Sequence, residues 1–343
     1  MSCATCHDPA FAHGPPNAAP VQVGGAFETE FGLRAAPSLR YLERIGSFSG
    51  TLQSKPEDMR GGLMADGRAD SLAAQALLPW FNSREMDNGN ASILARKLRT
   101  AAYAGDFARV FAIPAADDNT WVTQASEALQ AFQLEDSRFH PYNAKVDRVL
   151  AGQEQLSAAE FRGLRVFNDP LRGNCASCHP ADVSGNLAPV FTTFGYAAIG
   201  VPRNAAIPRN LDSGYVDLGL CESTQAAVKG RADACGFFRI PSLRNVAERP
   251  VFFHNGQFNS LEQVLRFYNT RDSEPALWYP SVAGQVQRFD DLPERYRPNL
   301  NTLAPFGPKA LMSDADLADL LCFLRTLSDG HVPNAPPRGE CLR

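Results

Sequence analysis

Two copies of one short pattern constrain this chain more than any other feature. Cys3-Ala4-Thr5-Cys6-His7 stands near the start, and Cys175-Ala176-Ser177-Cys178-His179 follows about half-way along the sequence. At this spacing two thiols can bond to the vinyl groups of one haem, and the adjacent histidine can ligate its iron. One copy alone could be half of a zinc site. Two copies, with no further Cys-x-x-Cys, favour two covalent haem c groups.

Composition excludes several other classes of protein. The chain has 343 residues, 44% hydrophobic and 20% charged, which suits a globular protein of about two domains. Its net charge of -4 provides no basic surface, so we expect no nucleic acid partner. Since no apolar run approaches ~18 residues, we also expect no membrane span.

Four cysteines remain of the eight once the haem motifs are assigned: Cys221, Cys235, Cys322 and Cys341. We predict disulfides Cys221–Cys235 and Cys322–Cys341, because each pair closes a short loop; the alternative is four free buried thiols. In bacteria haem c is attached outside the cytoplasm, where disulfides also persist. This combination predicts a periplasmic protein.

The start of the chain lacks the signal peptide that export to the periplasm requires. Met1 lies two residues before the first motif, which leaves no room for a signal peptide. The second motif follows a segment with helix signals, Ser157 as N-cap and Glu160 three residues later. Nothing equivalent precedes Cys3. We therefore expect the native protein to begin earlier, with a signal sequence and a helix over the first haem.

The sequence predicts a mainly α fold, two tandem cytochrome c-like haem domains with long irregular loops, divided at 1–140 and 141–343. A linker is expected at about 135–155. Capping residues and apolar periodicity place the helices. The expected helices are 71–78, ended by Pro79, then 90–102, 120–134, 157–167, 261–268 and 314–327.

His7 and His179 are the expected proximal ligands, and the sixth position of each iron decides the chemistry. An iron with six protein ligands carries electrons, whereas an open iron can activate peroxide. Methionine and histidine are the usual sixth ligands, and spacing alone leaves all of these open: Met59, Met64, Met86, Met312, His13, His140, His254 and His331.

Four blocks carry a family resemblance. They are Ser2–Pro9, around the first motif, Asp66-Gly67-Arg68, Phe238–Asn245 and Phe253-His254-Asn255-Gly256. With them the whole chain resembles the bacterial di-haem cytochrome c peroxidase and MauG superfamily, apart from that family's leading helix. The resemblance implies that the N-terminal haem domain reacts with peroxide and the C-terminal one transfers electrons.

The resemblance also implies a distal pocket over the first haem, in the family's Gln-x3-Pro-x5-Glu-Met pattern. Gln75, Pro79, Glu85 and Met86 have that spacing. A carboxylate above the iron can take a proton from one peroxide oxygen and return it to the other. Glu85 is therefore the expected acid/base and Gln75 the amide that positions peroxide. Without the family, Glu85 would be read as an ordinary surface carboxylate.

The second iron separates the branches of the family. The peroxidases have a methionine ligand fourteen residues after the histidine of the His-Asp-Gly block, whereas the MauG/MbnH-like branch has tyrosine. Fourteen residues after His254 lies Tyr268. A phenolate stabilises oxidised iron, because an anionic oxygen lowers its potential. The alternative is that Tyr268 only packs in the core. His254 is expected beside the second haem without ligating it.

Two family features do not carry over directly. The family's Trp-Asp-Gly-Arg turn places an electron relay between the haems, but Ala65 holds the tryptophan position here. Either another aromatic serves, Trp80 being nearest in sequence, or transfer between haems is slower. The family also binds Ca2+ through backbone carbonyls that match Arg249 and Val251. Its asparagine ligand has no match that we can place.

Three functions follow from these expectations. The first is a MauG-like peroxidase-type oxidoreductase that uses hydrogen peroxide to reach a high-valent di-haem state and oxidises a residue of a partner protein. The second is a cytochrome c peroxidase that reduces peroxide to water with electrons from a small cytochrome. The third is a non-catalytic electron carrier. Tyr268 favours the first over the second, and Gln75 with Glu85 argues against the third.

Overall fold

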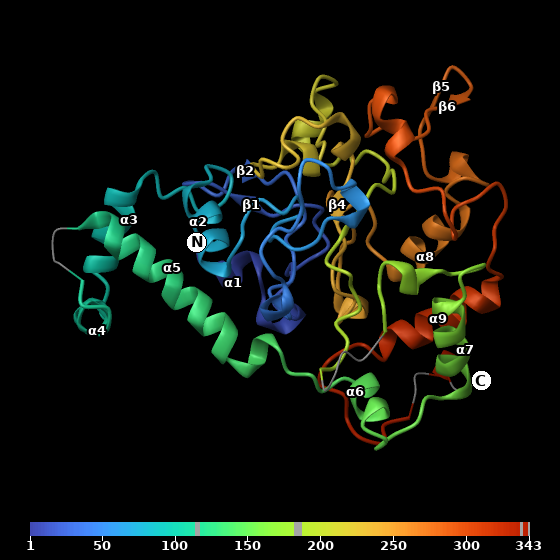
Figure 1. Cartoon of the computed structure of the whole chain (residues 1–343), viewed down its shortest axis with the longest axis horizontal. Helices are drawn as coiled ribbons and strands as arrows, with labels where there is room; N and C mark the ends of the chain where they lie inside the picture. Colours follow the sequence, from blue (N-terminus) through green and yellow to red (C-terminus); the bar gives the residue numbers. More distant parts are fainter. Residues whose placement is uncertain (114–116, 182–186, 337–338, 342–343) are drawn as a thin grey trace.

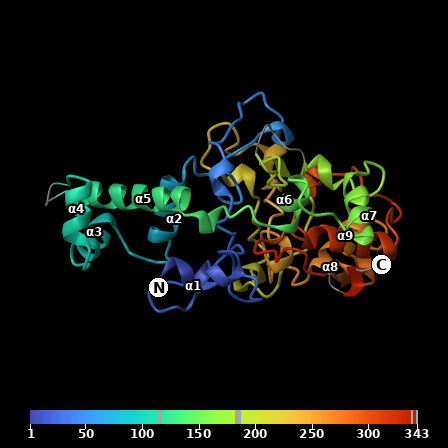
Figure 2. The same ribbon diagram turned by 90° about the horizontal axis from the view of Figure 1, so that it is seen from below.

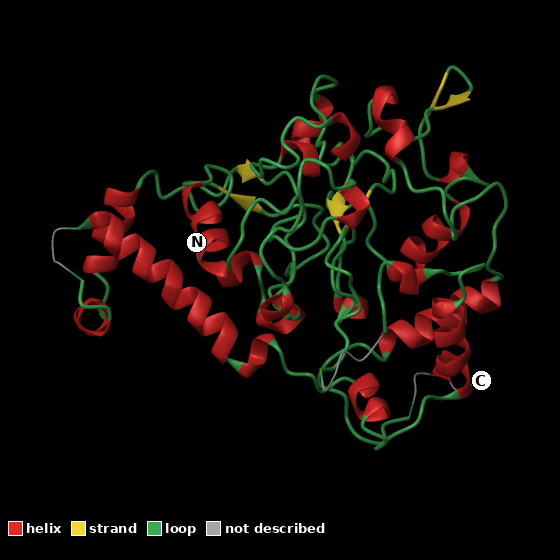
Figure 3. Ribbon diagram, in the orientation of Figure 1, coloured by secondary structure: helices red, strands yellow, loops and turns green. Residues whose placement is uncertain are grey.

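The computed structural model describes residues 1–113, 117–181, 187–336 and 339–341. Helices gather at the two ends of the molecule, and long loops fill the middle (Figures 1 and 3). The α-helices are α1 (Cys3–Cys6), α2 (Leu72–Phe81), α3 (Ala91–Arg99), α4 (Ala104–Val110), α5 (Asp118–Glu135), α6 (Lys145–Leu150), α7 (Ala158–Asn168), α8 (Leu261–Thr270) and α9 (Asp314–Arg325).

Extended structure is limited to short antiparallel pairs. The strands, in pairs, are β1 (Val23–Gly24) with β2 (Glu30–Phe31), β3 (Tyr196–Ala197) with β4 (Phe238–Arg239), and β5 (Ser281–Val282) with β6 (Gln285–Val286). The mainly helical fold expected from the sequence is therefore found. Within the described residues no helix is long and apolar enough to cross a membrane.

Side-chain caps start the main helices where the sequence predicts. Ser71, Asn90, Ser157 and Ser313 each accept a hydrogen bond from the backbone N–H three residues on. The predicted stop at Pro79 is wrong, because α2 continues two residues further, to Phe81. A proline removes one helical hydrogen bond, here the one to the carbonyl four residues before, and neighbouring bonds can carry the helix past it.

The helices α2, α3 and α5 form a lobe at one end of the molecule, which Figure 2 shows set apart from α6–α9. Trp80, Leu94 and Trp121 are buried together there. The expected apolar stripe of α5 is only partly buried, since Phe132 is 45% exposed and lies against Phe139. In this lobe α2, which carries Gln75, is the helix that lies beside the central loops (Figure 1).

The segment expected to be a linker is structured. It contains α6, and the Lys145 ammonium at the start of this helix lies 2.6 Å from the Glu160 carboxylate of α7. Both side chains are buried, so the pair ties the segment to the second half of the chain. The helix propensity of six residues was too weak a signal to predict this element.

At the other end, α7 packs closely against α9. A side chain at Gly163 of α7 would collide with the backbone oxygen of Asp319 in α9. Phe167 of α7 and Phe323 of α9 are buried in contact, with ring centroids 5.2 Å apart. The disulfide Cys322–Cys341 fixes the chain's last described residue to α9.

The central loops come from both halves of the sequence. Met59, from the first half, is fully buried among Tyr196, Leu220 and Phe237 of the second half. The disulfide Cys221–Cys235 belongs to the same cluster. The loops are thus held by a shared apolar core and a covalent bridge, in place of regular secondary structure.

Candidate functional site

The two predicted proximal histidines are held in the same way. Nδ1 of His7 lies 2.9 Å from the carbonyl oxygen of Pro37, and Nδ1 of His179 lies 2.8 Å from that of Phe191. A carbonyl only accepts, so Nδ1 carries the proton and Nε2 keeps a free lone pair. Burial lowers the pKa of His7, and lowers that of His179 to about 4. Both imidazoles are therefore neutral, as metal ligation requires.

The thiols of the two motifs are free, in contrast to the other cysteines. Cys3 and Cys6 lie on α1, while Cys175 and Cys178 lie on and just after a 3-10 turn, Cys175–Ser177. The pairs Cys221–Cys235 and Cys322–Cys341 form disulfides in the structure. Burial raises the pKa of Cys175 to about 12. Free neutral thiols beside a neutral imidazole are the donor set that a haem c attachment site needs, so the residues present fit the group.

Gln75 and Glu85 each interact with a residue of the turn that precedes α2. Nε2 of Gln75 lies 3.7 Å from Sδ of Met64, and the charge of Arg68 lowers the pKa of Glu85. The side-chain amide of Asn82 donates to Glu85 Oε2 at 2.8 Å. The backbone of this segment is bound to α2, because Met86 N donates to Pro79 O at 3.0 Å. Gln75 and Pro79 thus lie on α2, and Glu85 lies in the segment that folds back onto the end of this helix.

The environment of Glu85 is suited to proton transfer. Burial raises its pKa above the ordinary value, more than Asn82 and Arg68 lower it. Glu85 also lies near the first haem motif, because after burial its charge is the next cause of the raised pKa of the Cys6 thiol. A carboxyl of raised pKa exchanges protons closer to neutral pH than an exposed one.

Tyr268 lies on α8 among aromatic rings. Its ring centroid is 5.5 Å from that of Phe306 and 5.9 Å from that of Phe253. Burial raises its pKa, and the thiols of Cys178 and Cys175 raise it further, so the phenol lies near the second haem motif. The buried Tyr279 of the same cluster donates to Gly200 O at 2.7 Å. Within the described chain the Tyr268 hydroxyl has no such protein partner.

Three of the other candidate sixth ligands are engaged elsewhere. Met59 is fully buried in the central cluster. His331 lies 3.0 Å from the Glu154 carboxylate, and His13 stacks on Phe139 with ring centroids 4.4 Å apart. Met64 contacts Gln75, as described above. These contacts reduce the set that spacing alone left open.

Comparison with known proteins agrees with this geometry. Residues 1–155 match a family model described as di-haem cytochrome c peroxidase. The methylamine utilization protein MauG of Paracoccus denitrificans is 33% identical over 96% of this chain and 84% of its own length. The chain belongs to the di-haem cytochrome c peroxidase/MauG family. It is therefore a peroxidase-type oxidoreductase of a family that carries two haems.

Two further relatives are named as peroxidases. The diheme peroxidase BthA of Burkholderia thailandensis is 38% identical, with a TM-score of 0.88 over 96% of this chain and 81% of that one. A cytochrome c551 peroxidase of Pseudomonas aeruginosa is 26% identical over 77% of this chain and 65% of its own length. Both names state a peroxidase, but only the second names a cytochrome.

A buried ion network joins the two halves of this family member, and sequence reasoning missed it. The Arg34 guanidinium lies 2.7 Å from the Asp66 carboxylate and 2.6 Å from that of Asp217. Arg68 pairs with Asp66 as well. The Asp-Gly-Arg block drew attention to Asp66 and Arg68 in the sequence, although it did not predict their ion pairs. Nothing in the sequence pairs Arg34 with a residue 183 positions away.

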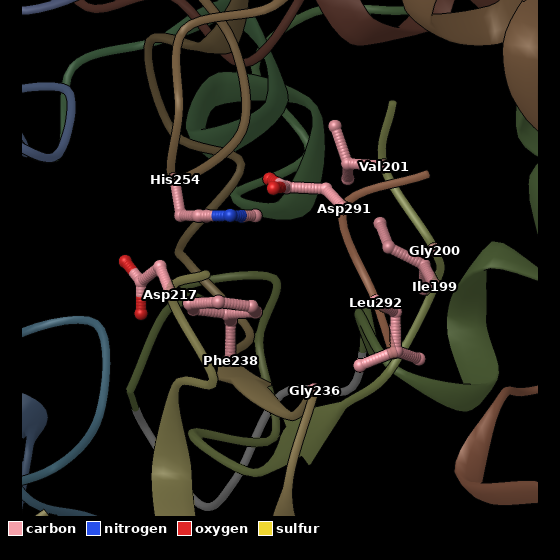
Figure 4. Close-up of a pocket in the computed structure, with 9 residues that line it drawn as sticks. All are labelled: Ile199, Gly200, Val201, Asp217, Gly236, Phe238, His254, Asp291 and Leu292. Carbon is pink, nitrogen blue, oxygen red and sulfur yellow. The ribbon is translucent and has the colours of Figure 1, made fainter. Parts of the chain in front are cut away.

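His254 lies beside this network. Its imidazole stacks on Phe238 with ring centroids 3.6 Å apart, and Figure 4 shows the Asp217 and Asp291 carboxylates on either side. Burial lowers the pKa of His254 to about 4 and raises that of Asp291 to about 6. The cavity lined by these residues has a volume of about 20 Å³, enough for about one water. Phe253, which precedes His254 in the sequence, is one of the rings that pack against Tyr268.

The position of the family's relay tryptophan contains no aromatic side chain here. The Ala65 carbonyl accepts a hydrogen bond from Arg239 N at 2.8 Å. Trp80 is buried with Leu94 and Trp121 in the lobe of α2, α3 and α5. That packing places Trp80 among helices of the first half, which does not favour it as the substitute relay.

Proposed function

We propose that this protein is a MauG-like di-haem oxidase, which takes oxidising equivalents from hydrogen peroxide and uses them on a residue of a partner protein. The observation that carries this proposal is the Tyr268 hydroxyl, which lies near the second haem motif without a described hydrogen-bond partner. The side chain is partly buried, and the hydroxyl oxygen makes no hydrogen bond to another described protein group. Ligation of a metal would satisfy its oxygen.

In this proposal His7 would hold the haem whose iron would bind peroxide, and the chain's side chains would orient the peroxide and move its proton. Glu85 takes a proton from one peroxide oxygen and returns it to the other, while the Gln75 amide orients the peroxide. The contact between Gln75 and Met64 at 3.7 Å and the hydrogen bond from Asn82 to Glu85 support these roles by limiting side-chain motion.

His179 and Tyr268 are the residues that would hold the iron of the second haem. The hydrogen bond from His179 Nδ1 to Phe191 O orients Nε2, and the rings around Tyr268 fix the phenol. A phenolate disfavours reduction of the iron. The site then suits storage of an oxidising equivalent better than acceptance of electrons from a small cytochrome.

The alternative is a cytochrome c peroxidase that reduces peroxide to water. The family description and the cytochrome c551 peroxidase relatives favour it. A pure electron carrier is less well supported, because Gln75 and Glu85 would have no role in one. The periplasm as location, and the division into haem domains at 1–140 and 141–343, remain part of the proposal.

Peroxide added to the diferric protein separates the three functions. The proposal expects a long-lived oxidised spectrum that decays when a partner protein is oxidised. Rapid turnover that requires reduced cytochrome c would instead identify the peroxidase, and an unchanged spectrum would identify the carrier. A pull-down in the presence of peroxide, followed by mass spectrometry for oxidised Trp or Tyr, then identifies the partner.

A further inference from the structure

Arg249 is a partly buried cation at the junction of the two halves. Its Nε lies 3.3 Å from the carbonyl oxygen of Val251, and its Nη2 lies 3.2 Å from that of Ala36. In the part of the chain that the structure describes, no carboxylate lies within ion-pair distance of it. Burial without such a partner lowers the pKa of Arg249 to about 10. Carbonyl oxygens alone therefore hold this charge.

These are the residues at which the family resemblance places calcium, but they do not fit the ion. Ca2+ takes six to eight oxygen ligands, commonly including carboxylates. The Val251 carbonyl already accepts from a guanidinium, and a second cation beside it would be repelled. Nor do the described residues contain a group of three or more His, Cys, Asp or Glu side chains that could hold a metal ion.

The Arg249 contact also reaches the first haem ligand. Ala36 precedes Pro37, whose carbonyl accepts from Nδ1 of His7 at 2.9 Å. The segment 35–37 is bound to the second half at another point, where Ala35 N donates to His254 O at 2.7 Å. A displacement of the guanidinium would therefore move the carbonyl that orients this imidazole.

We propose that the guanidinium of Arg249 replaces the calcium ion, joining the two halves and positioning His7 with a charge that belongs to the chain. Arg249 is then a positioning residue, which acts on the first haem through the segment 35–37. The protein needs no divalent cation for this purpose. This inference is independent of the proposed function, because it holds whether the enzyme oxidises a protein or a cytochrome.

The first test is made on the unaltered holoprotein. Elemental analysis after purification in millimolar calcium, followed by desalting, is expected to find two irons and less than 0.1 calcium per chain. Excess EDTA should leave the electron paramagnetic resonance spectrum of the ferric haems unchanged. One tightly bound calcium, or a spectrum that changes with EDTA and recovers with calcium, would overturn the proposal.

The second test removes the cation. Arg249→Ala should change the ferric resonance of the His7 haem, and millimolar guanidinium chloride should restore it by occupying the space. Arg249→Lys should keep most of the native signal, and it tests the proposal even if the alanine variant does not fold. An Arg249→Ala spectrum identical to the native one, or a change that calcium reverses in Arg249→Lys, would contradict it.

Arg231→Ala is the matched control. Arg231 also reaches carbonyl oxygens of the first half, Thr51 O at 3.3 Å and Ser54 O at 3.0 Å, but it makes no contact with the segment 35–37. Its removal should lower stability without altering the resonance of either haem. Equal spectral changes in the two alanine variants would show a general loosening of the junction and would overturn a specific role for Arg249.

Discussion

Asn82 donates a hydrogen bond of 2.8 Å to the Glu85 carboxylate, three residues further along the chain. The bond stabilises the charged form of Glu85, but burial outweighs it and the pKa is raised. The carboxylate is thus fixed in position and also ready to accept a proton. Both properties are needed in a group that transfers protons within bound peroxide.

Glu85→Gln should slow the reaction with peroxide by about 10²-fold or more, because an amide cannot accept the proton. Stopped-flow absorbance of the haem of His7 measures the rate. Glu28→Gln is the control, since Glu28 also raises the pKa of the Cys6 thiol but is exposed. Equal rates for the native protein and Glu85→Gln would remove Glu85 from the mechanism.

The pH dependence of the same rate should reflect the raised pKa of Glu85. The active form is the carboxylate, so the rate should fall as the pH is lowered, with a midpoint above the ordinary carboxyl value of 4.5. This acid limb should be missing in Glu85→Gln, whose side chain does not titrate. A limb of unchanged midpoint in that variant would assign the titration to another group.

Tyr268→Phe should abolish the long-lived oxidised state while leaving both haems attached. The phenyl ring keeps the packing against Phe253 and Phe306, and only the oxygen is lost. Tyr279→Phe is the control, because it removes a hydroxyl from a nearby core tyrosine that donates to Gly200 O. Optical spectra after peroxide addition measure the state. Its survival in Tyr268→Phe would exclude the phenolate ligand.

Arg34→Met should destabilise the protein by about 3–5 kcal/mol, because it leaves the buried Asp217 carboxylate without its partner. Asp66 loses less, since Arg68 remains beside it. Urea denaturation of the holoprotein measures the change. Adding Asp217→Asn should recover part of the loss, as coupled partners do. A cost below about 1 kcal/mol for Arg34→Met would show that the network is not a structural junction.

His254 should make the protein less stable in acid. Its folded-state pKa is about 4, below the 6.5 of an unfolded histidine, so the unfolded state binds the proton first. Stability is complete above pH 6.5 and is lost as the pH falls toward 4, by up to about 3 kcal/mol. His254→Phe keeps an aromatic ring against Phe238 and should flatten this dependence. Parallel curves for the two proteins between pH 4 and 7 would refute it.

Helix starts and disulfide pairs were predictable from the sequence, because residues close together along the chain determine them. The capped starts at Ser71, Asn90, Ser157 and Ser313 depend on residues within one turn, and the structure has them. The two disulfide pairs were also chosen by short separation, and both bridges are formed. The end of α2 was wrong because a proline weakens a helix without always stopping it.

The parts that were missed depend on long-range packing. Arg34 and Asp217 meet only because the central loops interlock, and no periodic pattern marks either residue. Arg249 was predicted only through its backbone carbonyl, whereas its side chain makes the informative contacts. For Trp80, the packing of α2, α3 and α5 determines where the indole lies, and nearness in sequence to Ala65 gives no information on this packing.

The burial of Met59 in a cluster built by the second half bears on how such a chain can be divided. A gene cut after residue 140 would give one fragment with an exposed thioether and another with an unfilled hole among Tyr196, Leu220 and Phe237. Neither product would be a self-sufficient cytochrome. Two attachment motifs in one polypeptide thus describe a duplicated chemical unit, whereas the packing around Met59 makes the folding of the two halves interdependent.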